Sequence, residues 1–429
     1  MTGSAKRFAV IGAGAAGLCA AKHLASRGLG VTVYELGSRV GGLWVYESDN
    51  GLSPAYKSLH LNSEARVTAY TDFPFPASAP LYPDHVEVAD YLDAYADKFD
   101  LKRHIRFQTE VVSAKPNGES NWRVTTADGA FEDFDGVIVA TGHQHRPLHP
   151  QWRDAFEGEY LHAHGYRAPE PFRDKRVLVV GVGNSAVDIA ADICVVTKAT
   201  VMSARSPVLI MPRTLFGVPT SRVLARLEKG WMPWPVRRAI RRFLTFVAHG
   251  RMEQWGFVTP TTRTHPTTHP SLMAHMLWRR ITVRPGIVAV KGKEFQFTDG
   301  SRESFDIVIA ATGYEIELPF LSPEWRPLEN GRLDLFARIV SPKAPGLYFL
   351  GMFNVNGGGN IRMMDEQAEW LMPILTGEVR LPSAAAMRGM IAREHALVAA
   401  RFPAGARYAL ELEPPLYRKT LAAAKASMR

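Results

Sequence analysis

The chain has 429 residues, of which 46% are hydrophobic and 22% are charged, and its formal net charge at pH 7 is +9. This composition is typical of a globular protein with two or three domains, and it excludes the disordered and fibrous classes. No nucleic-acid-binding motif accompanies the positive charge, so we attribute the charge to the binding of phosphate-bearing small molecules and expect no nucleic acid as a partner.

No apolar stretch is long enough to span a membrane, and an integral membrane anchor is therefore not expected. The amino terminus reaches a buried-strand pattern at Phe8, which leaves no room for a signal peptide. Both features predict a cytoplasmic protein. The two cysteines, Cys19 and Cys194, do not form a CxxC pair, so we expect two small buried side chains and no dithiol relay.

Residues 7–34 follow the pattern of a strand, a glycine-rich turn, a helix and a second strand. Gly12, Gly14 and Gly17 form GxGxxG directly after an apolar run. The first glycine permits a tight turn, the second lets the backbone approach a pyrophosphate, and the third lets the helix pack on the strand. The pattern predicts a Rossmann-type site with the phosphate at the helix amino terminus, next to Ala15 and Ala16.

Glu35 closes the second strand of this unit. A carboxylate at this position accepts hydrogen bonds from ribose hydroxyls and repels a 2′-phosphate, which favours FAD as the ligand. A surface glutamate that only ends a strand is the alternative.

Further along, residues 84–101 have helical spacing and predict a core helix, and a strand is expected at 105–115. Val111 of that strand is included among the candidate FAD contacts.

The glycine pattern returns in residues 175–205, where Gly181 and Gly183 repeat the turn and Ala186 stands at the third position. The end of the second strand differs, because Ser203 and Arg205 replace the carboxylate. A hydroxyl and a cation suit a 2′-phosphate, so this unit is predicted to bind NADPH. A solvent-facing Arg205 without a ligand is the alternative.

Two near copies flank this second unit, FDGVIVATGHQ at 134–144 and FDIVIAATGYE at 305–315. Each is an apolar strand that ends in Ala-Thr-Gly, where the chain could cross between domains. Their ends supply four further candidate cofactor contacts, which are Thr141, Gly142, Thr312 and Gly313.

The predicted fold class is α/β, with two Rossmann-like dinucleotide-binding domains and the NADPH domain inserted in the FAD domain. The predicted segments are 1–167 (FAD, first part), 168–314 (NADPH, with a helical insert at about 207–280) and 315–429 (FAD, second part).

Within the insert, residues 234–250 predict a basic amphipathic helix. We expect its apolar stripe to pack on its own domain, and a membrane surface is the alternative. Histidines occur in GHQHRPLHP at 142–150 and in THPTTHP at 264–270. No acidic or cysteine partner lies at ligand spacing, so no metal site is expected.

FEGEYLHAHGY, residues 156–166, has the form F-x-G-x-x-x-H-x-x-x-Y and resembles the fingerprint of the class B flavoprotein monooxygenases. Tyr166 at its end, followed by Arg167, resembles the flavin-containing monooxygenase branch, because Baeyer–Villiger enzymes usually have tryptophan there. Other segments follow in the order of the family: GGLW (41–44), YKSLHLN (56–62), DFPFP (72–76), GNSAVD (183–188), ATGYEIELPFL (311–321) and GLYFLG (346–351).

The resemblance implies a reaction cycle. NADPH reduces FAD, O2 adds to flavin carbon 4a, and retained NADP shields the C4a-hydroperoxyflavin until a soft nucleophile takes its distal oxygen. The expected substrate is a small molecule with an amine nitrogen or a sulfide sulfur. Two alternatives stay open: Baeyer–Villiger oxygenation of a ketone, and an NADPH-oxidising or redox-sensing flavoprotein that oxygenates nothing.

The resemblance also implies roles for single residues. Asn62 corresponds to the catalytic asparagine beside the flavin and the nicotinamide ribose, and a turn asparagine is the alternative. Gly42, Leu43 and Trp44 correspond to flavin contacts. Asn184, Ser185 and Asp188 correspond to NADP contacts at a helix start. The fingerprint residues Phe156, Gly158, His162 and Tyr166 correspond to a hinge strip that couples NADPH binding to the flavin site, although a core-packing His162 is equally compatible.

This sequence departs from the family in three places. Leu61 replaces the threonine that many relatives have before the asparagine, and SEARV follows at 63–67. Both changes put the substrate pocket in doubt, and no substrate residue is assigned. The chain ends in LAAAKASMR, without the apolar anchor of animal members, which agrees with a soluble enzyme. A homodimer is considered possible.

Overall fold

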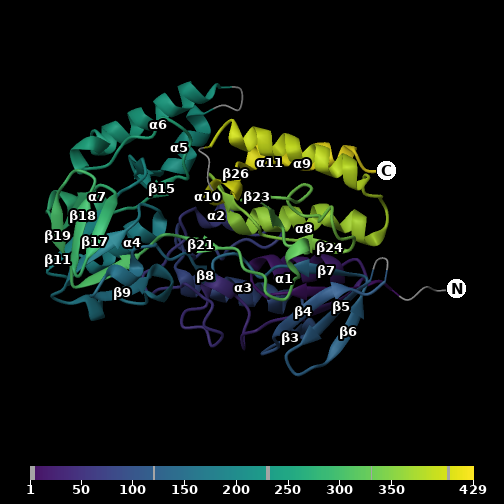
Figure 1. Cartoon of the computed structure of the whole chain (residues 1–429). Coiled ribbons are helices and arrows are strands. Elements are labelled where there is room, and N and C mark those ends of the chain that lie inside the picture. Colours follow the sequence, from purple (N-terminus) through teal and green to yellow (C-terminus); the bar gives the residue numbers. More distant parts are fainter. Residues whose placement is uncertain (1–4, 119–120, 229–231, 330, 403–405) are drawn as a thin grey trace. The chain divides into compact units, whose positions relative to one another are not determined.

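The computed structural model describes residues 5–118, 121–228, 232–329, 331–402 and 406–429. The chain divides into two compact units (Figure 1). The first comprises residues 1–53, 63–146 and 315–429, and the second comprises 54–62 and 147–314. The second unit therefore interrupts the sequence of the first one twice.

The first unit is built on a parallel five-stranded sheet in the order β24-β7-β1-β2-β3. Its central strand β1 is buried from its second residue onward, because helices and a second sheet cover its apolar side chains. The strands are β1 (Arg7–Ile11), β2 (Gly30–Tyr34), β3 (Ile105–Arg106), β7 (Gly136–Val139) and β24 (Leu347–Phe349). The helices are α1 (Ala15–Ala25), α2 (Ala65–Thr68), α3 (His85–Lys98), α8 (Asn360–Thr376), α9 (Ala384–Ala399), α10 (Ala406–Ala409) and α11 (Pro414–Ala426).

The expected core helix is α3, which starts with a capping box between Asp84 and Glu87. An antiparallel three-stranded sheet completes this unit with β4 (Val111–Pro116), β5 (Trp122–Thr126) and β6 (Phe131–Phe134). Its buried side chains join an apolar core with those of β1, β7 and β24.

The second unit repeats the architecture with a parallel sheet in the order β16-β11-β10-β20-β9. The strands are β9 (Glu159–His162), β10 (Arg176–Val180), β11 (Ala199–Ser203), β16 (Ile281–Arg284) and β20 (Ile307–Ala310), and α4 (Asn184–Ile193) follows β10. An antiparallel sheet is formed by β17 (Ile287–Lys291), β18 (Glu294–Phe297) and β19 (Arg302–Ser304). Two parallel sheets, each with a glycine turn after its central strand, confirm the predicted α/β class.

Residues 207–280 contain the helices and short strands of the insert. They are β12 (Ile210–Met211), β13 (Thr214–Leu215), β14 (Val218–Pro219), α5 (Thr220–Leu227), α6 (Trp234–His249), β15 (Thr267–Thr268) and α7 (Leu272–Leu277). The stripe of α6 packs only in part, since Ile240 and Leu244 are half-buried while Val236 and Val247 are 45% and 51% exposed. The remaining strands are β8 (Arg146–Pro147), β21 (Tyr314–Glu315), β22 (Leu328–Glu329), β23 (Arg332–Leu333), β25 (Asn354–Val355) and β26 (Glu411–Leu412).

Both cysteines are free and buried, one on α1 and one directly after α4. Within the described ranges, no helix combines the length and the apolar character needed to cross a membrane. The same part of the chain contains no group of three or more His, Cys, Asp or Glu side chains arranged to hold a metal ion.

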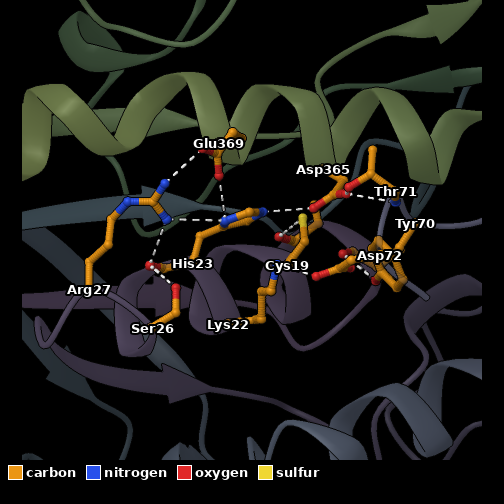
Figure 2. Close-up of polar contacts among 12 residues, drawn as sticks. Cys19, Lys22, His23, Ser26, Arg27, Tyr70, Thr71, Asp72, Asp365 and Glu369 are labelled. Atoms are coloured by element: carbon orange, nitrogen blue, oxygen red, sulfur yellow. Dashed lines mark hydrogen bonds and ion pairs between the residues drawn. The ribbon is translucent and has the colours of Figure 1, made fainter.

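A buried polar contact between His23 and Asp365 connects α1 to α8 in the first unit (Figure 2). His23 Nε2 lies 2.8 Å from Asp365 Oδ1, and His23 Nδ1 lies 2.9 Å from Glu369 Oε2. The Asp365 side chain is 1% exposed, and its other oxygen accepts hydrogen bonds from the backbone and the hydroxyl of Thr71. Arg27 completes the network through Glu369. This network fixes α1, the helix that follows the first glycine turn.

We expect Asp365→Ala to lower the free energy of unfolding by about 3–5 kcal/mol, because it leaves the donors of His23 and Thr71 buried without an acceptor. Urea denaturation measures this change. Asp97→Ala is the control, since Asp97 is 62% exposed in its pair with Lys102 and its loss should cost about 1 kcal/mol or less. Equal losses in both variants would contradict a structural role for the buried pair.

Acid should weaken the same network. Burial alone would raise the pKa of Asp365, but hydrogen bonds from His23 and Thr71 outweigh it and hold the pKa below its ordinary value. The ionised carboxylate therefore contributes stability above about pH 4, and this contribution is lost as the pH falls further. The stability difference between wild type and Asp365→Ala should shrink over that range.

Candidate functional site

The first glycine turn, at the carboxyl end of β1, has the geometry of a phosphate-binding loop. Gly12 has a φ of +103°, and a Cβ there would lie 2.7 Å from the carbonyl oxygen of Ala140, so only glycine fits. A Cβ on Gly17 would lie 1.8 Å from the carbonyl oxygen of Gly12. Gly14 is open, with Gly42 Cα as its nearest neighbour at 3.6 Å. No side chain caps α1, so its first N–H groups are available to an anion.

Glu35 is buried at the end of β2 and supports this loop. Its carboxylate accepts hydrogen bonds of 2.7 Å from the backbone N–H groups of Ala13 and Gly37. Only 6% of the residue is exposed, so the interpretation as a surface glutamate is wrong. A carboxylate held at this point retains lone pairs for ribose hydroxyls, which agrees with the predicted FAD site.

The other candidate FAD contacts lie around the same turn or in the core beside it. Gly42, Leu43 and Trp44 form a 3₁₀ turn, and the backbone of Gly42 approaches Gly14. Thr141 and Gly142 follow β7, the parallel neighbour of β1, so they lie at the same edge of the sheet. Val111 is different, because its side chain is buried in the core with Ile11 and Tyr34.

The second glycine turn, after β10, repeats these contacts with other residues. Gly181 has a φ of +135°, and its Cβ would lie 2.6 Å from the carbonyl oxygen of Ala311. The two Ala-Thr-Gly segments thus have equivalent places, each beside a glycine turn. Gly183 precedes α4, and no side chain caps this helix. The side chain of Asn184 accepts a hydrogen bond of 3.3 Å from the backbone N–H of Thr268. Ser185 is exposed. Space is open around Gly313, and the hydroxyl of Thr312 donates to the carbonyl of Leu148 at 2.5 Å.

Ser203 and Arg205 have different environments at the end of β11. Ser203 is 2% exposed and donates its hydroxyl proton to the carbonyl oxygen of Pro285 at 2.9 Å, so this donor is already used. Arg205 is exposed, and a Cβ on Gly286 would lie 3.3 Å from its Cγ. Among the described residues no carboxylate forms an ion pair with Arg205. The guanidinium is therefore available to a phosphate.

Two aspartates on α4 hold other segments of the second unit. Asp188 accepts a hydrogen bond of 2.8 Å from the hydroxyl of Tyr56. Asp192, one turn later, accepts hydrogen bonds from Ser58 at 2.8 Å and from Tyr166 at 2.5 Å. Asp188 is 9% exposed, and burial raises its pKa to about 6 although the bond from Tyr56 opposes this. Asp192 was not among the residues predicted from the sequence. Its position four residues after Asp188 on an apolar helix places both side chains on the same face, and this spacing could have indicated it.

The fingerprint residues build the edge strand of this sheet and anchor it. Gly158 allows close packing, because a Cβ there would lie 2.3 Å from the ring of Phe156 and 2.7 Å from the carbonyl oxygen of Asp306. His162 ends β9, and its Nδ1 accepts a hydrogen bond from the backbone of His164. Burial lowers the pKa of His162 to about 4, so the ring is neutral at pH 7. Tyr166 is fully buried, and its hydroxyl donates a hydrogen bond to Asp192 on α4.

Asn62, the candidate catalytic residue, is exposed at the end of the segment that Tyr56 and Ser58 attach to α4. Its Oδ1 accepts a hydrogen bond of 3.0 Å from Nη2 of Arg213. Sequence reasoning missed Arg213, because it lies in an irregular segment between two short strands where no periodicity points to it.

The flavin-binding monooxygenase-like family matches residues 5–412 of this chain. The chain belongs to this family. It is 31% identical over 412 residues to flavin-containing monooxygenase 1 of Homo sapiens, an alignment that covers 89% of this chain and 76% of the relative. Among solved structures, S-allyl-L-cysteine S-oxygenase from Allium sativum has a TM-score of 0.74 and 24% identity, covering 99% of this chain and 89% of that one. Cyclohexanone monooxygenase from Rhodococcus sp. Phi1 bound to NADP+ has a TM-score of 0.71 and 17% identity, covering 99% of both chains.

These similarities identify a flavin-dependent monooxygenase, an oxidoreductase whose cofactors are FAD and NADPH. The two structures, at less than 25% identity, bear on the fold alone. They confirm two Rossmann-like domains with the NADPH domain inserted in the FAD domain. The glycine turns, the uncapped helix starts and the buried Glu35 fit the two cofactors.

We expect Gly158→Ala to destabilise this flavin-binding monooxygenase-like protein by about 1–3 kcal/mol, because the added methyl group overlaps the ring of Phe156 and a backbone carbonyl. Thermal unfolding measures the effect. Gly389→Ala is the matched control, since Gly389 lies in α9 with no atom within 4 Å of the added Cβ. That change should be neutral or stabilising by up to about 1 kcal/mol. If both variants unfold like the wild type, the close packing at Gly158 is not required.

Proposed function

We propose that this enzyme uses NADPH and O2 to oxygenate an amine nitrogen or a sulfide sulfur of a small molecule. The observation that carries the proposal is the match to flavin-containing monooxygenases over most of their length. A relative of 31% identity, named as a dimethylaniline monooxygenase that forms N-oxides, supports the amine nitrogen, and a sulfide sulfur is proposed as the other soft nucleophile. Tyr166 at the end of the fingerprint favours this branch over Baeyer–Villiger oxygenation of ketones, the alternative that cyclohexanone monooxygenase represents.

The first unit is proposed to bind FAD through the turn of Gly12, Gly14 and Gly17 and through Glu35. Uncapped N–H groups at α1 bind the pyrophosphate, and Glu35 accepts hydrogen bonds from the ribose. The remaining proposed FAD contacts are Ala15, Ala16, Gly42, Leu43, Trp44, Val111, Thr141 and Gly142. The bound flavin supplies the oxygen-activating chemistry, while the protein orients it and excludes water.

The second unit is proposed to bind NADPH at the turn of Gly181 and Gly183 and at the start of α4. Arg205 provides the positive charge for the 2′-phosphate. The remaining proposed NADPH contacts are Asn184, Ser185, Asp188, Ser203, Thr312 and Gly313. Of these, Asp188 and Ser203 already have partners inside the protein, so Ser185 and Arg205 are the contacts that the geometry favours most.

Asn62 is proposed to hydrogen-bond the cofactors and to keep activated oxygen available for the substrate. An amide suits this role, because it donates and accepts hydrogen bonds without carrying a charge.

A cytoplasmic location and a homodimeric state also stay predictions. Cell fractionation tests the location, and light scattering tests the oligomeric state.

We expect Arg205→Ala to raise the Michaelis constant for NADPH at least tenfold and to leave that for NADH nearly unchanged. A charge-assisted hydrogen bond to the 2′-phosphate contributes about 1.5–3 kcal/mol, and NADH lacks this group. Initial rates with both nucleotides measure the effect. Arg173→Ala removes another exposed arginine of the same unit and should change neither constant. Equal losses with NADPH and NADH would show that Arg205 is structural.

We expect Asn62→Leu and Asn62→Asp to leave flavin reduction by NADPH intact but to raise hydrogen peroxide release about tenfold per NADPH consumed. The lost hydrogen bond is worth on the order of 1–3 kcal/mol, and the carboxylate would also repel negative charge near the cofactor. Anaerobic stopped-flow absorbance measures reduction, and a peroxidase assay measures the release. Asn121→Leu, a change of another exposed asparagine, should stay coupled. Fully coupled Asn62 variants would make Asn62 a turn residue.

The proposed function itself is tested with the purified, yellow, FAD-containing protein. A panel of tertiary amines, sulfides and ketones is incubated with NADPH and O2, and products are identified by mass spectrometry. N-oxides or sulfoxides in proportion to NADPH consumed are expected. Esters or lactones from ketones would favour the Baeyer–Villiger alternative. Hydrogen peroxide equal to NADPH with every compound would favour an NADPH oxidase or redox sensor.

A further inference from the structure

The contact between Asn62 and Arg213 determines which way the Asn62 amide faces. Nη2 of Arg213 lies 3.0 Å from Oδ1 of Asn62. A guanidinium has five N–H donors and no acceptor, so only the amide oxygen can face it. The orientation of the amide therefore follows from hydrogen bonding. The NH2 group points away from Arg213, and in the described part of the chain it donates to no other residue.

Arg213 is itself held in place by a buried threonine. The backbone N–H of Thr220 donates to the carbonyl oxygen of Arg213 at 2.9 Å, and the Thr220 hydroxyl donates to that of Pro212 at 2.6 Å. Thr220 is 5% exposed and begins α5. On the other side of Arg213, strand β12 is fully buried and pairs with β15. The backbone that carries Arg213 is thus fixed at both ends.

The charge of Arg213 acts on two largely buried groups of the same unit, Asp188 and His269. The carboxyl group of Asp188 is buried, and its Oδ1 lies 3.5 Å from Nε2 of His269. His269 accepts hydrogen bonds at Nδ1 from Ser271 and Leu272, and burial together with the charge of Arg213 lowers its pKa to about 3. His269 is therefore neutral at pH 7. Burial raises the pKa of Asp188, while the hydrogen bond from Tyr56 and the charges of Arg213 and His60 lower it, so Arg213 contributes to stabilising this carboxylate.

We propose that Arg213 is a positioning residue for Asn62: it holds Oδ1 of the amide and leaves the NH2 group as the hydrogen-bond donor for the cofactor. This inference rests on the proposed function, in which Asn62 contacts the cofactors. It explains why the amide would act in one orientation only. A freely rotating amide would present its oxygen half of the time, and an acceptor cannot stabilise negative charge on oxygen.

The first experiment measures the orientation without any turnover. The holoenzyme is labelled with ¹⁵N at asparagine, and the side-chain NH2 signals of Asn62 are assigned by their loss in Asn62→Asp. These signals should shift in Arg213→Met, which removes the donors and keeps an unbranched apolar stem. They should not shift in Arg226→Met, a matched change of an exposed arginine on α5. Unchanged Asn62 signals in Arg213→Met would overturn the proposal.

The second experiment separates positioning from cofactor binding. Arg213→Met should leave the NADPH Michaelis constant and the rate of anaerobic flavin reduction within about twofold, and should raise peroxide release per NADPH about tenfold, as expected for one lost hydrogen bond. Arg213→Lys, which retains one cationic donor group, should recover part of the coupling. A large rise of the NADPH Michaelis constant would instead make Arg213 a nucleotide contact and overturn the proposal.

The double variant Asn62→Leu with Arg213→Met distinguishes the remaining outcomes. If Arg213 acts through Asn62, the double variant should release no more peroxide than Asn62→Leu alone, because the effects are not additive. Additive losses would overturn the proposal. If Asn62→Leu stays coupled while the NMR signals shift as expected, the orientation by Arg213 holds and the proposed role of Asn62 is wrong.

Discussion

Two aspartates one turn apart on α4, Asp188 buried and Asp192 partly buried, require hydrogen-bond donors, and three side chains of the second unit supply them. A buried aspartate without donors would cost several kcal/mol. The donors are Tyr56 for Asp188, and Ser58 and Tyr166 for Asp192. One helix that begins at the proposed NADPH pyrophosphate site thereby fixes the segment leading to Asn62 and the end of the fingerprint. Parts that are proposed to serve different steps of the reaction are thus hydrogen-bonded to one helix.

The parts of the fold that depend on local pattern could be predicted from the sequence. Both glycine turns, the strands before them and the helices after them follow from glycine spacing and apolar runs, because a backbone oxygen lies too close to Gly12, Gly17 and Gly181 for any Cβ. The chemical difference between Glu35 and Arg205 could be predicted for the same reason. Both residues follow the second strand of their unit, and the opposite signs of their charges are visible in the sequence.

The parts that depend on contacts distant in sequence could not be predicted. Nothing near Asn62 indicates that Arg213, 151 positions later, would bind it. The pair of His23 and Asp365 likewise joins helices from opposite ends of the chain, so each residue alone resembles an ordinary surface position. Ser203 shows the converse, since its place beside Arg205 suggested a phosphate contact while the fold supplies Pro285 as its acceptor. Family resemblance predicted positions, but only the structure shows which donors are already used.

The nine residues from 54 to 62 have a consequence for protein engineering. They interrupt the sequence of the FAD domain, yet their contacts place them in the second unit, and the backbone N–H of Lys57 bonds to the carbonyl of Arg167 at 2.9 Å. An excised recombinant fragment of residues 147–314 would lack Tyr56 and Ser58, and would keep Asp188 and Asp192 with fewer donors. Cofactor swapping by grafting this domain into another reductase therefore requires the short distant peptide as well, joined by a linker or by circular permutation.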